Sequence, residues 1–431
     1  MITLALALAA AAAPLLQDGD RVVFFGDSIT VAHGYTRYVE AFVRMRHPEM
    51  NITFINAGIG GNAGMDALAR VDTDVIADHP TVVFVNFGVN DAGYPPDTPG
   101  YAFEKNILAV FEKLQAAGVR LIVWCETTPV DVEGLGKNHP KKKREERIEE
   151  LVAFEQKTAA ANPLAQTKIV LVPWFKPLAD AMLAWKAARP TDKPLIPDTI
   201  HPSPGGQAIM AVEVLRALGF EMLPAASHAR YDKSKATLDV DVGGALAWDG
   251  KAPITFDARA LPPVPFVVDK KEAADLGVPE LQTLRKLVLR VDGLDATKHY
   301  RVKAGDIDVG RFSARELAVG IDVMAWSQPR PLPVPGEPQV LLRPTLGQCS
   351  ATTGNPFLND WECVTDMLFE KDQLRILMRH EKTYAVPDFV PTYTERFFGL
   401  EGEWVAAVEG ELVLRTKKLR DAPHPITLTP E

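Results

Sequence analysis

The chain has 431 residues, of which 47% are hydrophobic and 24% charged, a composition typical of globular proteins with one large domain and an appendage, or two to three domains. Its formal net charge of −9 argues against a general affinity for nucleic acid or anionic membranes. The three cysteines are too few for a disulfide scaffold, and no CxxC, HExxH or EF-hand motif occurs, so we expect no metal and no cofactor. Pairing between Cys349 and Cys363 and the oligomeric state stay open.

An uncharged run rich in alanine and leucine occupies positions 2–16. It resembles the apolar part of a secretory signal, with small residues near Ala11 and Ala12 for cleavage, although the usual positive residues before it are missing. Residues 1–20 are therefore predicted to be a signal peptide and leader, and the protein to be exported to the periplasm or beyond. No later stretch has 18 unbroken apolar residues, so we expect no membrane span.

Short apolar runs rich in β-branched residues alternate with helix-length segments across residues 21–225. The pattern predicts buried parallel strands at 21–25, 52–56, 81–86, 119–125 and 168–172. An apolar stripe predicts a crossover helix over 102–117, and the basic run Lys141–Arg144 followed by glutamates is typical of a solvated helix face. Together these elements predict an α/β fold, a three-layer α/β/α sandwich around a five-stranded parallel sheet.

The alternation stops near residue 228, and a smaller β-rich C-terminal region is predicted to follow. Strands at 286–294 and 300–312, with Asp-Gly and Gly-Asp turns, predict a small antiparallel module over 229–325. The proline-rich run 328–338 is typical of a stiff linker. No fold is assigned to 326–431; within it, 360–380 is predicted to be partly helical and 402–419 to form a hairpin.

Gly26-Asp27-Ser28 follows the first predicted strand directly and precedes a helix-like stretch. Such a turn points into the groove above the sheet, so Ser28 is a candidate nucleophile, a phosphate ligand or simply the cap of the next helix.

Two further polar loops follow the next two strands, at the same edge of the sheet. "NAGIGGNA" (56–63) contains Gly58, Gly60 and Gly61, whose backbone can approach a ligand and offer N–H groups to an anion. "FGVNDAGY" contains Asn90, whose amide can reach the same groove, and Asp91, which can hold the loop. Each loop alone could be no more than a turn.

Asp198 and His201 lie three positions apart, just before a helix predicted to start near Pro204. The carboxylate can fix the imidazole tautomer and leave the other ring nitrogen free to act as a base, although a histidine beside a proline is more often a surface residue. Four further side chains could line a pocket or only pack in the core: His33, Tyr35, Tyr94 and Trp174.

With these blocks in order, residues 21–223 resemble the SGNH or GDSL hydrolase family, which has a flavodoxin-like sheet. The blocks are Gly26–Thr30, Gly61, Gly88–Asp91 and Asp198–His201. The resemblance implies that Ser28 is the nucleophile, His201 the base and Asp198 its orienting acid, which agrees with the reading of the residues. It also implies an oxyanion hole formed by the Ser28 N–H, the Gly61 N–H and the Asn90 side chain, with Asp27 and Asp91 in support.

The resemblance thus implies a serine hydrolase that cleaves carboxylic esters through an acyl-enzyme. We expect a small-molecule or polysaccharide ester substrate, with a short-chain or carbohydrate O-acetyl ester first. The alternatives are a lysophospholipase or thioesterase type of lipolytic enzyme, and a non-catalytic surface protein that binds carbohydrate or an anion.

Overall fold

A computed structural model describes the chain over residues 13–95, 97–132, 140–241, 243–258, 263–266, 270–324 and 424–431, and at single positions between 364 and 417. The predicted cleavage region, the proline-rich linker, and Cys349 and Cys363 lie outside these residues. Within them, no helix is both long and apolar enough to cross a bilayer. Cys125 is a free, fully buried thiol of the core.

The five predicted strands form one parallel sheet in the order β2-β1-β3-β4-β5. This is the order of flavodoxin-like sheets, and it confirms the predicted fold class. The central strands are buried on both faces, as their continuous apolar sequences require. The strands are β1 (Arg21–Gly26), β2 (Thr53–Gly58), β3 (Val82–Asn86), β4 (Leu121–Cys125) and β5 (Lys168–Val172).

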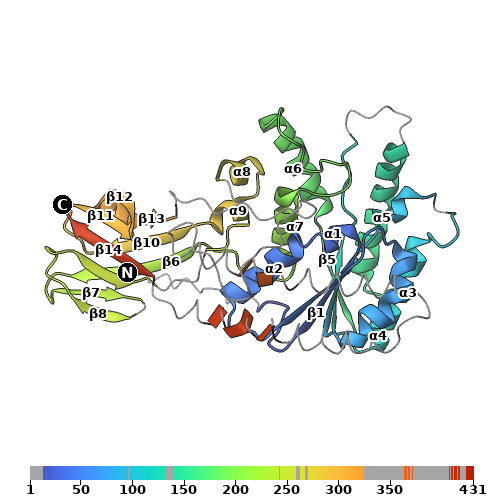
Figure 1. Ribbon diagram of the computed structural model, residues 1–431, viewed down its shortest axis with the longest axis horizontal. Helices are drawn as coiled ribbons and strands as arrows, with labels where there is room; N and C mark the ends of the chain where they lie inside the picture. The colour runs from blue at the N-terminus through green and yellow to red at the C-terminus, as the bar shows by residue number, and fades with distance from the viewer. Residues whose placement is uncertain are drawn as a thin grey trace, which may run out of the picture.

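Helices cover both faces of this sheet (Figure 1). One face carries α2 (Tyr35–Arg46) and α7 (Pro204–Ala217), which pack on each other, with α6 (Phe175–Ala188) beside α7. The other face carries α3 (Gly64–Asp74), α4 (Phe103–Ala116) and α5 (Pro140–Ala161). Helix α4 confirms the predicted crossover helix, because its stripe of buried residues, Phe103, Ile107, Val110, Phe111 and Leu114, faces the core.

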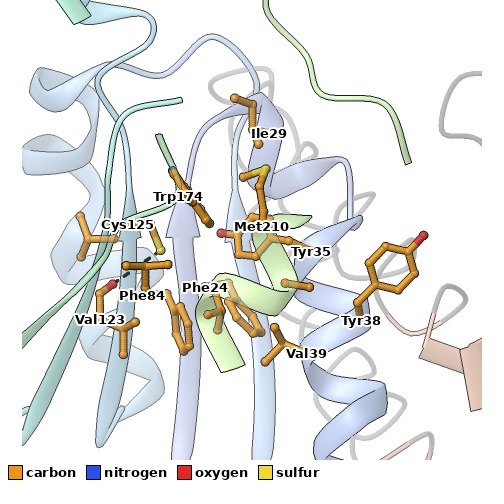
Figure 2. Packing of buried hydrophobic residues seen from close by; sticks show 14 of the residues in the cluster. Phe24, Ile29, Tyr35, Tyr38, Val39, Phe84, Val123, Cys125, Trp174 and Met210 are labelled. Atoms are coloured by element: carbon orange, nitrogen blue, oxygen red, sulfur yellow. Dashed lines mark hydrogen bonds between the residues drawn. The ribbon is translucent and has the colours of Figure 1, made fainter. Parts of the chain in front are cut away.

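Aromatic side chains fill the layer between the sheet and α2 (Figure 2). Phe24 of β1 lies 4.6 Å from Phe84 of β3 and 5.9 Å from Tyr35 of α2, measured between ring centroids. Tyr35 also meets Trp174 edge to face at 5.3 Å. Tyr35 and Trp174, both considered as pocket residues from the sequence, are therefore core residues, and so is the fully buried His33.

The β-rich part contains two further sheets, in the orders β13-β10-β6-β7-β8 and β12-β11-β14-β9 (Figure 1). Their strands are β6 (Ala225–Asp232), β7 (Thr237–Val240), β8 (Gly244–Ala247), β9 (Ile254–Asp257), β10 (Leu287–Asp292), β11 (His299–Ala304), β12 (Ile307–Ser313), β13 (Ile321–Asp322) and β14 (Pro425–Pro430). Strands β11 and β12 form a hairpin over the predicted Gly-Asp turn. The purely antiparallel prediction is wrong at one pair, because β6 and β10 run parallel.

The two hydrophobic cores do not follow chain order. Short helices α8 (Lys270–Asp275) and α9 (Pro279–Thr283) pack against α6 and α7, whereas α10 (Ala314–Val319) packs against β10 and β12. Four residues far along the chain belong to the α/β core: Val364, Met367, Leu368 and Leu412. Strand β14 pairs with β9 and β11 in the β-rich part. The predicted boundaries near 225 and 325 stay predictions, and the chain crosses between the cores more than once.

The described positions between 364 and 371 are helical, which agrees with the partial helix predicted there. The predicted hairpin over 402–419 is wrong at the described positions, because Glu409, Gly410, Leu412–Leu414 and others are also helical. Leu412 is fully buried against the α/β core while Leu414 is exposed, so burial does not follow the two-residue alternation of a strand.

A buried charge cluster fastens this late segment to α2. The Lys371 ammonium lies 2.5 Å from Glu40 Oε1, 3.0 Å from Glu409 Oε1 and 3.2 Å from the carbonyl of Phe54 in β2. Arg44 is bound to the same two glutamates, at 2.7 and 2.6 Å. Two cations and two carboxylates thus balance in a site where Lys371 and Glu40 are 3% exposed. Such clusters are costly to break one member at a time, because the remaining charges stay buried.

We therefore predict that Lys371→Met lowers the free energy of unfolding by about 3–5 kcal/mol, measured by urea denaturation. The methionine keeps most of the volume but removes one of the two cations that contact both glutamates. Lys235→Met is the matched control, since Lys235 pairs with Asp232 in solvent at 3.3 Å with 71% of its side chain exposed, and it should change stability by less than about 1 kcal/mol. Equal effects of the two substitutions would contradict a stabilising role for the cluster.

Candidate active site

Strand β1 ends at Gly26, where the backbone has no room for a side chain. A Cβ atom on Gly26 would lie 2.1 Å from Thr30 Oγ1 and 2.8 Å from the carbonyl oxygen of Asn86. The next helix, α1 (Ser28–Val31), begins at once and is capped by Asp27, whose Oδ1 accepts from Ile29 N–H at 2.9 Å. The interpretation of Ser28 as the cap is wrong, because Asp27 takes that position.

Ser28 and His201 lie 173 positions apart in sequence and meet at the edge of the sheet. The Ser28 Oγ atom is 2.7 Å from His201 Nε2, and His201 Nδ1 is 2.6 Å from Asp198 Oδ2. The imidazole is thus hydrogen-bonded on one side to a carboxylate and on the other to a hydroxyl. Exposed fractions of 44% for the His201 side chain and 55% for Asp198 leave the pair open to solvent.

The turn from Asp198 to His201 is folded around the Asp198 carboxylate. Its Oδ1 accepts from the backbone N–H of Ile200 at 3.0 Å and of His201 at 2.7 Å, while Oδ2 faces the imidazole. Thr199 has φ +77, in the left-handed region that costs a β-branched residue about 1–3 kcal/mol. The Asp131 N–H donates to the Thr199 carbonyl at 3.1 Å and holds the turn from outside.

Hydrogen bonds set the ionisation of Asp198. Burial alone would raise its pKa, but bonds from the His201 backbone and side chain and from the Ile200 N–H outweigh burial and lower the pKa to about 2. Asp198 is therefore an anion at any pH at which the protein works. The negative carboxylate beside Nδ1 favours the tautomer in which Nδ1 carries the proton. Nε2 is then free to accept a proton from Ser28.

The two glycine- and asparagine-containing loops meet beside Asp27. Asn90 Nδ2 donates to the Asn62 carbonyl at 2.9 Å and lies 3.5 Å from Asp27 Oδ2. Gly61, next to Asn62, has φ +78, and a Cβ placed on it would meet nothing within 4 Å. The structure thus brings the Asn90 amide next to the residue that precedes Ser28, and it places Gly61 in the open loop that Asn90 contacts.

Asp91 braces these loops against each other rather than closing a local turn. Its two carboxylate oxygens accept from the Gly64 N–H at 2.9 and 3.1 Å, across 27 positions of sequence. Burial raises the pKa of Asp91 to about 6 although the Gly64 bond acts against this. The bond fixes the start of α3 relative to the loop that carries Asn90.

Arg70 is a part of the site that sequence reasoning missed. Its guanidinium, on α3, donates to the carbonyls of Gly26 at 2.9 Å and Ala57 at 2.8 Å and to Asn62 Oδ1 at 2.6 Å. It also lies 4.5 Å above the Phe25 ring. One side chain therefore ties the ends of β1 and β2 to the Gly61 loop. No local pattern in the sequence marks a helical arginine for this task.

A second missed support lies under the Asn90 loop. The Thr127 hydroxyl bonds both the Phe87 carbonyl, at 3.1 Å, and the buried Glu155 carboxyl, at 2.8 Å. Gly88 has φ +117, and a Cβ on it would lie 2.0 Å from Thr127 Oγ1, so only glycine fits. Burial raises the pKa of Glu155 well above its ordinary value.

Among the described residues no group of three or more His, Cys, Asp or Glu side chains is arranged to hold a metal ion. The arrangement that is present, a hydroxyl on an imidazole on a carboxylate, activates an oxygen nucleophile. The Asn90 side-chain amide lies beside Asp27, the residue before Ser28.

Comparison with known proteins finds relatives of the α/β part of the chain. Residues 24–209 match the family described as GDSL-like Lipase/Acylhydrolase. An acetylxylan esterase of Geobacillus stearothermophilus is 29% identical over 234 residues, which are 48% of this chain and 97% of that protein. An uncharacterized lipoprotein, YqeF, of Bacillus subtilis (strain 168) is 33% identical over 129 residues, which are 27% of this chain and about half of the lipoprotein (52%).

A solved structure extends the likeness of fold beyond the α/β part. A gut microbial diltiazem-metabolizing enzyme aligns with 96% of this chain and 98% of its own, with a TM-score of 0.64 and 20% sequence identity. The two proteins share the fold, including additional β-rich sheets after the five-stranded parallel sheet.

The buried Asp27 predicts a pH dependence of stability. Burial raises the pKa of Asp27 to about 7, against bonds from Ile29 and the charges of His201 and Arg70. Between the ordinary carboxyl pKa and about 7, the folded protein binds more protons than the unfolded chain, so stability falls as pH rises through this range. Over pH 4 to 7.5 we expect the wild-type protein to lose about 3 kcal/mol more unfolding free energy than Asp27→Asn does.

Urea denaturation at several pH values measures this difference, and comparison with the variant cancels the similar contribution of Asp91. Asp180→Asn, which changes a 60% exposed aspartate on α6, is the control and should follow the wild-type curve. Parallel curves for the wild-type protein and Asp27→Asn would contradict the raised pKa.

Proposed function

Residues 24–209 are a domain of the GDSL-like lipase/acylhydrolase family, and on this premise we propose that the protein is a serine esterase that cleaves short-chain or carbohydrate O-acyl esters, acetyl esters first. The observation that carries the proposal is the Ser28–His201–Asp198 chain, with contacts of 2.7 and 2.6 Å. A hydroxyl so placed can lose its proton to the imidazole as it attacks a carbonyl carbon.

The proposed reaction has two balanced steps. Ser28 Oγ bonds to the carbonyl carbon and passes its proton to His201 Nε2, which then gives the proton to the alcohol oxygen as the ester bond breaks. Water repeats the sequence on the acyl-enzyme and releases the acid. The negative oxygen of each intermediate would receive hydrogen bonds from the Ser28 N–H, the Gly61 N–H and the Asn90 amide.

Two features support a carbohydrate as the alcohol. The relative from Geobacillus is an acetylxylan esterase, and the alignment covers 97% of its length. A cavity of about 430 Å³ adjoins the catalytic turn, and its lining includes Thr199, Asp131, Trp185, Lys186 and Arg189. His201 would protonate the leaving alcohol, so the alcohol lies beside the turn that carries Thr199, and paired charges beside an aromatic ring can bind its hydroxyl groups.

The anion-binding alternative fits the site less well. Helix α1 has only four residues, and the Asp27 carboxylate already accepts a hydrogen bond at its N-terminus. Because Asp27 already accepts the Ile29 N–H, this short helix end offers an anion little attraction. This alternative also gives no role to Asp198 and His201.

Export remains part of the proposal. The partial likeness to a Bacillus lipoprotein supports it, and an extracellular or periplasmic place suits a polysaccharide substrate. Lipolytic or thioester substrates are the alternative that a substrate screen would separate.

We predict that Ser28→Ala reduces hydrolysis of p-nitrophenyl acetate to the background rate without a change in thermal unfolding, because no other hydroxyl occupies this position. A fluorophosphonate probe should label the wild-type protein and not the variant. Ser234→Ala is the control, since Ser234 Oγ lies 2.7 Å from a carboxylate, that of Asp232, but outside this site; it should keep full turnover and labelling. Undiminished turnover by Ser28→Ala would remove Ser28 from the mechanism.

Asn90→Ala tests the oxyanion donor. Loss of one such donor should reduce kcat about 10²–10³-fold and change KM little, because the bond strengthens in the transition state. Steady-state kinetics with p-nitrophenyl acetate measure kcat and KM separately. A rise in KM at unchanged kcat would instead assign Asn90 to ground-state binding.

A further inference from the structure

Three apolar side chains form an exposed surface that the catalytic chain does not use. We name Met65, Tyr94 and Tyr101 the aromatic ledge. The Tyr94 and Tyr101 rings are stacked, with centroids 3.8 Å apart and planes at 25°. Exposed fractions of 45% for Tyr94 and 38% for Met65 are high for large apolar residues. One face of Tyr94 is covered by Tyr101, so its exposure belongs mainly to the rest of the ring.

The aromatic ledge is attached directly to the proposed oxyanion loops. A single 3-10 turn, η2 (Asp91–Gly93), separates Tyr94 from Asn90, so their backbones are within about 8 Å. Met65 follows Gly64, whose N–H is bound by the Asp91 carboxylate. The residues that hold Asn90 in place therefore also hold the aromatic ledge in place.

Packing keeps this surface in one shape. Asn106 on α4 donates to the Gly100 carbonyl at 2.8 Å, just before Tyr101. The Met65 sulfur lies against Gly100, only 3.0 Å from where a Cβ would stand. The Arg144 guanidinium of α5 fills the space beside Gly93, the residue before Tyr94. A preorganised aromatic face costs little conformational entropy when a ligand stacks on it.

The direction of the reaction decides which part of a substrate can reach this surface. His201 lies just before α7, one of the helices on the α2 face of the sheet, and the alcohol leaves beside His201 because His201 would protonate it. The aromatic ledge lies at the starts of α3 and α4, on the opposite face (Figure 1). Of the two remaining substituents of the carbonyl carbon, the oxygen would meet the Asn90 amide and the Gly61 N–H, which leaves the acyl group to extend past this loop toward Tyr94, four positions after Asn90.

We propose that the aromatic ledge is an acyl-group subsite that accepts flat, conjugated acyl groups, such as arylacryloyl or benzoyl groups, in addition to acetyl. This inference rests on the proposed esterase activity. A planar acyl group can add to the Tyr101–Tyr94 stack with its face parallel to the rings, and the Met65 thioether completes the apolar contact. A flexible alkyl chain on the same surface would gain only the burial of apolar area, without ring stacking.

Esters with one leaving group and different acyl groups test the proposal. We would measure kcat/KM for p-nitrophenyl acetate, hexanoate and cinnamate with the wild-type protein, Tyr94→Ala, Tyr94→Phe and Leu183→Ala. Leu183 is a 65% exposed apolar residue of α6, on the other face, and serves as the matched control. Tyr94→Ala should lower the cinnamate-to-acetate ratio of kcat/KM about tenfold, mainly through KM, while Tyr94→Phe and Leu183→Ala keep the ratio within about twofold.

A binding measurement tests this inference separately from the esterase proposal. Calorimetry with trans-cinnamamide, which has the acyl group but no ester, should give a Kd about tenfold weaker for Tyr94→Ala than for the wild-type protein. If no ester is hydrolysed, the proposed function fails and the cinnamamide result still decides the subsite. An unchanged ratio with unchanged cinnamamide binding would overturn the subsite. An equal loss for hexanoate, or a Tyr94→Phe variant as defective as Tyr94→Ala, would overturn ring stacking as its basis.

Discussion

The site depends on one carboxylate that serves three hydrogen-bond donors at once. Asp198 accepts from two backbone N–H groups and from the imidazole. The same carboxylate therefore both folds the turn and orients His201. The left-handed Thr199 shows that the turn is held against its local preference. Without that constraint, the ring of an exposed histidine would rotate freely and meet the Ser28 hydroxyl only part of the time.

The other half of the site is rigid for a different reason. Side chains are excluded at Gly26, which lies against Thr30 and the Asn86 carbonyl, and at Gly88, which lies against Thr127. Arg70 and Asp91 then connect the loops across the gaps between strands. Donors held in this way need little reorganisation when charge develops on a substrate, and this is the main source of electrostatic catalysis.

Much of this could be predicted from sequence, because the carboxyl ends of parallel strands share an edge and short motifs mark them. The five strands and the residues Ser28, Asn90, Asp198 and His201 are visible as local patterns. Arg70, Thr127 and Glu155 are not, since their partners lie 8 to 44 positions away and share no local motif with them. The hairpin expected near Leu412 failed because a short apolar run around a glycine suits either a strand or a buried helix, and only its partner in the core decides.

The four-stranded sheet has the order β12-β11-β14-β9, which places β14 between β9 and β11. Strand β9 ends at Asp257 and β11 begins at His299, whereas β14 starts only at Pro425. During synthesis, β9 and β11 therefore each keep an unpaired edge until the polypeptide up to β14 has left the ribosome. This delay leaves the nascent β-rich part open to mispairing, whereas the last strand of the five-stranded sheet is already complete at Val172.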